Sequence, residues 1–168
     1  VSLEGRTWWL LRASPLAMRD VLWAKYWMGT LPLLVLAVGL IGVTNTLMRV
    51  EPFMFAVSVF TITFMTFALA ALAIAFGTAF PRFESENAAQ IPTSFGGLLY
   101  MMTAVALIGG IVVLEARPVY SYLRARTFGE PLQTTELVMG FALAGVLTLS
   151  AIFIPLALAR RRLEAIER

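Results

Sequence analysis

The sequence predicts an all-α, polytopic helical membrane protein with about four transmembrane helices preceded by an interfacial elbow helix. First, 60% of the 168 residues are apolar and only 14% are charged, whereas a soluble domain is about 45–50% apolar and about 25% charged. Second, the apolar residues form four long blocks with the charges between them. Third, no block alternates as a barrel strand does. A mean hydropathy of +0.83 therefore excludes a soluble enzyme and a disordered chain.

A transmembrane helix needs about 20 mostly apolar residues. Four blocks meet this requirement: residues 31–47, 53–80, 95–114 and 137–158. The second block carries no charge and would be about 42 Å long as a helix, so we expect it to tilt or to protrude from the bilayer. Pro52 suits the first position of a helix, and Pro155 predicts a kink near the end of the fourth block.

Residues 1–30 differ from an ordinary span or loop. Ser14 followed by Pro15 predicts a helix that starts there and runs toward Pro32. All four tryptophans of the chain lie in this region: Trp8, Trp9, Trp23 and Trp27. Tryptophan favours the headgroup layer, which indicates an elbow helix in the cytoplasmic interface. The alternative is an ordinary span with an aromatic belt, because the charged residues of this region fall on scattered sides of a helix.

The basic residues predict the orientation. Nine of them lie before the first span, between the second and third spans, or in the tail 159–168: Arg6, Arg12, Arg19, Lys25, Arg82, Arg160, Arg161, Arg162 and Arg168. Four lie on the opposite side: Arg49, Arg117, Arg124 and Arg126. The excess places both termini and the 81–94 connection in the cytoplasm. Because these residues flank apolar blocks, we expect no binding to nucleic acid.

The sequence lacks the residues that several kinds of catalytic and binding site require. The chain has no Cys and no His, which excludes disulfides, the usual zinc sites and Ser-His hydrolases. It contains no G-x-x-x-x-G-K-[ST] phosphate loop, and the cores of the four predicted spans contain no charge. We therefore expect no catalytic residue, no metal and no cofactor bound by this chain, which would not be an enzyme. Any energy for transport would enter from elsewhere.

Small residues in two spans predict close helix packing. They are Thr66, Ala70, Ala73 and Gly77 on one face of the second span, and Gly140 and Ala144 in the fourth. A substrate path or a subunit interface is the alternative interpretation. The connection 81–94 is bounded by prolines and carries charged and amide side chains, which suit docking of a soluble partner; a solvated loop is the alternative.

Two cytoplasmic motifs resemble a known family. Glu4-Gly5-Arg6, with Leu10-Leu11-Arg12 and Ser14-Pro15 after it and Lys25 before a span, resembles the entry segment of ABC-type exporter permeases of the type-2 superfamily. Phe80-Pro81-Arg82-Phe83-Glu84, with Ser94-Phe95-Gly96-Gly97, resembles a bacterial subgroup of ABC exporters. The similarity extends from Ser2 to the fourth span and is compositional in the spans.

The resemblance implies the permease portion of an ATP-driven ABC exporter in the bacterial cytoplasmic (inner) membrane. A separate ABC ATPase subunit would bind Mg–ATP and contact the 81–94 connection. The candidate contacts to that subunit are Arg82, Phe83, Glu84, Glu86 and Asn87, and the candidate elbow anchors are Glu4, Arg6, Trp8 and Trp9. The other implied partners are the remaining permease spans or a second permease half, and the lipid bilayer.

The chain begins with Val1 rather than Met, and it has four predicted spans where a permease domain of this superfamily has about six. We therefore expect a C-terminal portion of a longer protein. Two alternatives remain open from the sequence: a membrane scaffold or assembly subunit that does not transport, and part of an ion-coupled carrier. The second would need an ionisable residue from another part of the protein.

Overall fold

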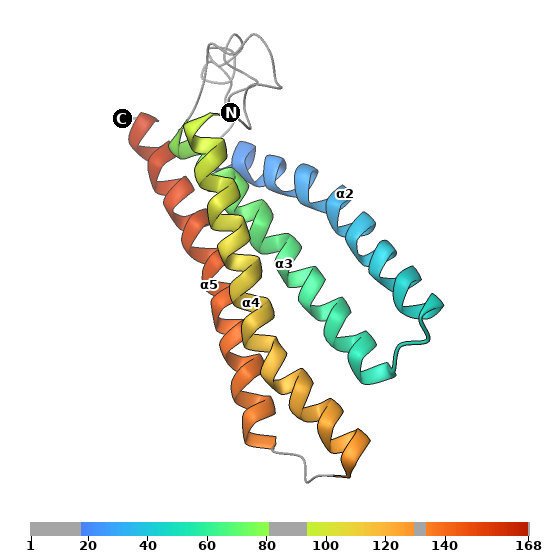
Figure 1. Ribbon diagram of the computed structural model, residues 1–168. Helices are drawn as coiled ribbons and strands as arrows, with labels where there is room; N and C mark the ends of the chain where they lie inside the picture. Colours follow the sequence, from blue (N-terminus) through green and yellow to red (C-terminus); the bar gives the residue numbers. More distant parts are fainter. Residues whose placement is uncertain (1–17, 81–93, 130–133, 168) are drawn as a thin grey trace.

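The computed structural model describes residues 18–80, 94–129 and 134–167, with side chains described for residues 20–162 of these ranges. These residues form four α-helices: α2 (Met18–Leu47), α3 (Pro52–Ala79), α4 (Phe95–Phe128) and α5 (Thr134–Glu167) (Figure 1). Each helix is long and apolar enough to cross a membrane. The prediction of an all-helical chain with four membrane-spanning helices is thus confirmed at the level of length and composition.

No separate elbow helix appears among the described residues. Residues 18–30, which were predicted to belong to the elbow, form the first part of α2, and this helix continues through Pro32 to Leu47. Membrane helices tolerate such a proline because side chains and neighbouring helices satisfy the freed backbone groups. Residues 1–17, with the predicted helix start at Ser14, lie outside the described residues.

The turn from α2 to α3 is short, and the backbone around Arg49 explains why α2 ends there. Arg49 adopts a left-handed conformation with φ 51°. Around it, the Arg49 N–H donates to the Thr46 carbonyl at 3.2 Å and the Val50 N–H donates to the Asn45 carbonyl at 2.9 Å. This pair of bonds is a Schellman motif, which ends a helix by satisfying its last carbonyl groups. Pro52 then begins α3 at its first position, as the sequence predicts.

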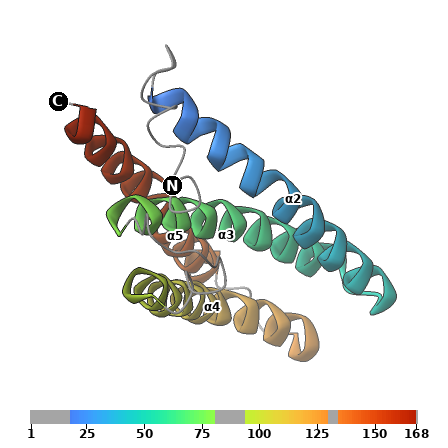
Figure 2. The ribbon, with the colours of Figure 1, turned by 90° about the horizontal axis from the view of Figure 1, so that it is seen from above.

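Helix α3 is the most extensively packed element, with its main contacts to α5 and α2 and a smaller one to α4. Its Met65, Ala68 and Leu72 form the main buried cluster with Leu107 and Ile111 of α4. A smaller cluster joins Leu22 of α2 to Ala159 of α5. Helix α2 lies on the outside of the group, beside α3 (Figures 1 and 2).

Helix α4 extends well beyond the apolar block from which it was predicted. It begins at the N-cap Ser94, whose hydroxyl accepts a hydrogen bond from the Gly97 N–H at 3.1 Å. It continues past Leu114 and through Pro118, and it ends before Gly129, which is left-handed with φ 70°. Glu115 therefore lies within a helix and faces the other helices of the bundle.

Candidate ligand-binding cavity

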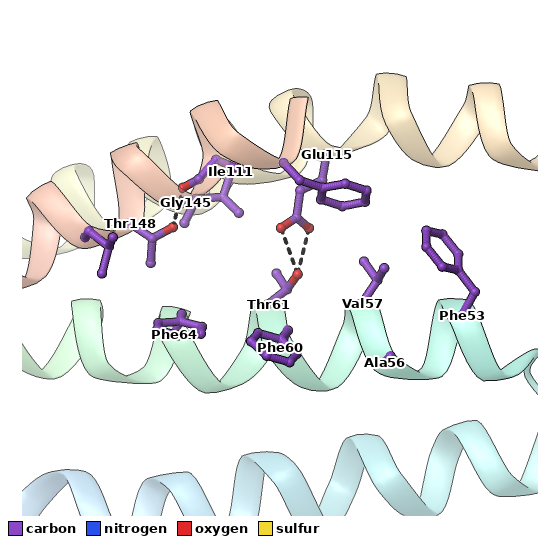
Figure 3. A pocket seen from close by; sticks show the side chains of 13 residues that line it. Phe53, Ala56, Val57, Phe60, Thr61, Phe64, Ile111, Glu115, Gly145 and Thr148 are labelled. Carbon is purple, nitrogen blue, oxygen red and sulfur yellow. Dashed lines mark hydrogen bonds between the residues drawn. The ribbon is translucent and has the colours of Figure 1, made fainter. Parts of the chain in front are cut away.

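A cavity of about 430 Å³ lies between α3, α4 and α5. Its wall is mainly apolar and rich in aromatic side chains. The principal lining residues are Phe53, Phe60 and Phe64 of α3, Ile111 of α4, and Thr148 of α5 (Figure 3). Phe141 of α5 also lines the cavity. One acidic residue, Glu115 of α4, also lines the cavity.

The Glu115 carboxylate faces α3 across the cavity. The Thr61 hydroxyl lies 2.8 Å from one carboxylate oxygen and 2.9 Å from the other, and Figure 3 shows the two side chains pointing toward each other. A hydroxyl has a single proton to donate, whereas an ionised carboxylate has about four acceptor positions. Within the described ranges, no Lys or Arg forms an ion pair with Glu115. The carboxylate therefore keeps acceptor capacity for a ligand.

Glu115 also lies deep along its helix. It precedes Arg126 by 11 residues, which corresponds to about 16 Å along an α-helix. Glu115 is half-buried against α3, whereas the arginine that follows it by two residues, Arg117, is exposed. Ionisable side chains within membrane helices are costly, and they usually mark a binding or transport site.

A cluster of three polar residues, Glu51, Tyr122 and Arg126, lies beside the cavity at the end nearest the α2–α3 turn. Glu51 forms an ion pair with Arg126 and accepts a hydrogen bond from the Tyr122 hydroxyl at 2.9 Å. The Tyr122 ring stacks on Phe53, with the ring centroids 4.0 Å apart. Because Phe53 also lines the cavity, these contacts between α3 and α4 set the position of part of the wall.

The predicted packing residues occupy different environments. Ala144 is buried, and an added Cβ at Gly140 would lie 2.7 Å from the Pro118 ring, so α4 and α5 approach closely there. On α3, Thr66 is buried, whereas Ala73 is exposed and no atom lies within 4 Å of a Cβ built on Gly77. Ala70 is half-buried. Ala144 also lines the cavity, so it takes part in both packing and the candidate site.

The other predicted site residues are not described by the structure. They are the candidate ATPase contacts Arg82, Phe83, Glu84, Glu86 and Asn87, and the candidate elbow anchors Glu4, Arg6, Trp8 and Trp9. Their roles stay predictions.

Sequence reasoning missed Glu115. The apolar block ends at Leu114, so hydropathy predicts that Glu115 begins an outward-facing connection, residues 115–136, between the third and fourth spans. A signal was present in Gly129, since glycine is the residue that most often follows the end of a helix. The 14 residues from Glu115 to Phe128 contain one proline and no other helix breaker.

Four helices that are long and apolar enough to cross a membrane define a helical membrane protein. Over residues 1–168 the chain matches the model of a family described as "Putative ATP-binding cassette", and it belongs to that family. The expected relationship to ABC transporters is thereby confirmed. No curated protein and no solved structure matches the chain.

The family corrects the predicted function. Its description names the ATP-binding cassette, which implies ATP hydrolysis and points to an ATPase-like role. The prediction of a non-enzymatic permease portion driven by a separate ATPase subunit is therefore wrong. It relied on the missing phosphate loop, the charge-free span cores and the two cytoplasmic motifs, but the absence of a motif from a segment does not determine whether the protein hydrolyses ATP. The described residues themselves do not fit a Mg–ATP site of the phosphate-loop type, because they form helices and contain no strand to precede such a loop.

Proposed function

We propose that the described helices form the membrane-embedded, ligand-binding region of an ATP-hydrolysing ABC protein. In this proposal, the cavity between α3, α4 and α5 binds an apolar molecule that carries a cationic group. The observation that carries the proposal is Glu115, a carboxylate that faces an apolar cavity and has a hydroxyl, but no cation, as its partner among the described residues.

The chemistry of the wall supports this ligand class. Cavities of about 300–1,000 Å³ with mainly apolar walls and a few polar groups are typical of small-molecule sites, and this cavity falls within that range. Aromatic rings such as Phe60 and Phe64 attract both hydrocarbon and cations. A neutral or anionic ligand would leave the Glu115 carboxylate without a counter-charge in an apolar environment, which is unfavourable.

The remaining parts of the proposal come from the sequence and the family. The nine-to-four distribution of basic residues supports a bacterial cytoplasmic membrane location with both termini in the cytoplasm. Trp8 and Trp9 support an interfacial position for the first residues. Membership of an ATP-binding cassette family supports Mg–ATP as a cofactor of the protein and association with other ABC components.

Tetraphenylphosphonium and tetraphenylborate provide a matched test, because they have nearly the same shape and opposite charges. We expect the protein in lipid nanodiscs to bind the phosphonium saturably and the borate not at all. Glu115→Gln should weaken phosphonium binding about tenfold or more, the effect of losing a charged partner. The matched control is Glu136→Gln, because Glu136 is exposed in the first turn of α5.

A second variant tests whether weaker binding arises from a change in the cavity rather than from unfolding of the protein. No atom lies within 4 Å of a Cβ built on Gly145, which lines the cavity. Gly145→Leu should therefore fill the cavity and abolish phosphonium binding while thermal stability is retained. Equal binding of the two ions, or unchanged affinity in both Glu115→Gln and Gly145→Leu, would contradict the proposed site. An absence of ATP turnover by the full-length protein would contradict the ATPase role and leave the cavity assignment standing.

A further inference from the structure

A second groove, of about 280 Å³, lies at the opposite end of the helices from the α2–α3 turn. It is bordered by the last two turns of α3, by Thr103 of α4 and by the stretch of α5 from Pro155 to Arg162. Its lining residues on α3 fall between positions 72 and 79, whereas those of the cavity described above fall between positions 53 and 64. The two sites share no residue and are separate features of the molecule.

The wall of this groove is suited to hydrocarbon. Leu72, Phe76 and Leu158 supply apolar surface. The two threonines of the wall use their hydroxyl protons within their own helices: Thr78 donates to the Ala75 carbonyl at 2.9 Å, and Thr103 donates to the Leu99 carbonyl at 2.8 Å. An acyl chain could therefore occupy the groove without burying an unsatisfied hydroxyl.

A positively charged side chain, that of Arg162, lies at the rim of the groove. Arg162 lines the groove and its side chain is exposed, as is that of the adjacent Arg161. Arg162 follows Leu158 by one helical turn, so it lies where the apolar part of α5 ends. A membrane helix places such a position at the level of the lipid headgroups, where long basic side chains reach phosphate groups.

We propose that this groove binds an anionic phospholipid, with one acyl chain against Leu72, Phe76 and Leu158 and the headgroup phosphate paired with Arg162. The guanidinium is planar and presents several N–H donors, which match the oxygens of a phosphate better than an ammonium does. Arg161 adds positive charge at the same level and favours a lipid with net negative charge over a zwitterionic one. Arrangements of this kind, with basic residues above an apolar groove between helices, are typical of anionic-lipid sites.

Native mass spectrometry of the full-length protein tests the proposal. The protein is released from bilayers of equal parts phosphatidylglycerol and phosphatidylcholine, and the lipid that remains bound is identified. We expect retained phosphatidylglycerol to exceed phosphatidylcholine several-fold. Arg162→Gln should reduce that excess about fivefold, the factor expected for one basic residue near an anionic surface. The matched control is Arg49→Gln, because Arg49 is exposed at the other end of the molecule.

Two further measurements distinguish a lipid site from a simple anion site. Ala79→Leu narrows the groove without removing a charge, so it should also reduce retained phosphatidylglycerol. Inorganic phosphate at millimolar concentration should not displace the lipid, because it lacks an acyl chain. Equal retention of the two lipids by the unsubstituted protein, an Arg162→Gln variant that behaves like Arg49→Gln, or displacement by phosphate would each overturn the proposal.

Discussion

At the scale of single residues, Gly140 and Pro118 set how closely α5 approaches α4. Pro118 is fully buried. An added Cβ at Gly140 would lie 2.7 Å from both the Cγ and Cδ atoms of Pro118 and 3.2 Å from the Leu114 carbonyl oxygen. A proline ring cannot rotate away as a flexible side chain would. The contact therefore requires a glycine, whatever the helix propensity of alanine.

We predict that Gly140→Ala lowers the thermal stability of the purified protein. Overpacking usually costs about 1–3 kcal/mol, and alanine offsets about 1 kcal/mol of this cost in a helix interior. The expected net loss in the free energy of unfolding is therefore up to about 2 kcal/mol. The matched control is Gly109→Ala in α4, where no atom lies within 4 Å of the added Cβ. A Gly140→Ala protein as stable as the Gly109→Ala protein would contradict this account.

Glu115 and Glu51 show how far the contacts of single residues could be predicted from the sequence. A residue at the edge of an apolar block, such as Glu115, is assigned to a loop by any hydropathy argument, because such an argument averages over neighbours. Its Thr61 partner is 54 residues away in the chain, and Glu51 bonds to Tyr122 from 71 residues away. Partners at this separation depend on how helices pack, which the sequence pattern does not specify.

At the scale of helices, the α2–α3 pair is joined by a contact between two polar side chains near the turn that connects them. The Asn45 side-chain amide donates to the Ser58 hydroxyl at 2.6 Å, and Asn45 is buried. Ser58 in turn lies 2.9 Å from the Met54 carbonyl and 3.0 Å from the Phe55 carbonyl, to which it can donate. The contact connects one helix to the backbone of the next.

A double-mutant cycle with Asn45→Ala and Ser58→Ala should yield a coupling free energy of about 0.6 kcal/mol, with an upper bound of about 1.7 kcal/mol, as for other hydrogen bonds between membrane helices. Reversible unfolding in mixed micelles provides the measurement. Thr44→Ala with Ser58→Ala serves as the control cycle, because the Thr44 hydroxyl bonds within its own helix, to the Leu40 carbonyl at 2.8 Å. Additive effects in both cycles would contradict a direct contact.

The existence of each helix followed from its apolar block, and Pro52, Ser94 and Gly129 are sequence signals that the structure uses as helix ends. The length of α4 did not follow in the same way. Its last 12 residues carry Arg117, Arg124 and Arg126, which hydropathy assigns to water. Arg126 instead pairs with Glu51, the residue before α3, and this tertiary contact supports the continuation of the helix beyond its apolar part.

At the scale of the whole molecule, the proposed orientation can be tested directly because the chain contains no cysteine. Met48 is exposed in the α2–α3 turn and Arg161 is exposed at the other end. We expect Met48→Cys to react with a membrane-impermeant maleimide in intact cells, and Arg161→Cys to react only after the membrane is permeabilised. Reaction of both from the same side would contradict the four-span arrangement, and the reverse pattern would invert the proposed orientation.

The class of the whole protein followed from the sequence only in part. Composition indicated a membrane protein, and the cytoplasmic motifs indicated an ABC relationship that the family model confirms. The assignment of ATP hydrolysis to another subunit failed because it treated a missing motif as evidence about the whole protein. The cavity could not be predicted at all, since it arises from the packing of three helices whose spacing depends on contacts such as that between Gly140 and Pro118.

The four-residue turn between α2 and α3 has a consequence for the insertion of the protein into the membrane. The turn contains Arg49 and Glu51, so at neutral pH it carries no net charge. Carrying one unpaired charge across a membrane changes the free energy by about 2.3 kcal/mol per 100 mV of membrane potential. Because the two charges cancel, the potential neither opposes nor assists the passage of this turn. In the proposed orientation, the two helices would therefore enter as one hairpin whose insertion does not depend on the membrane potential.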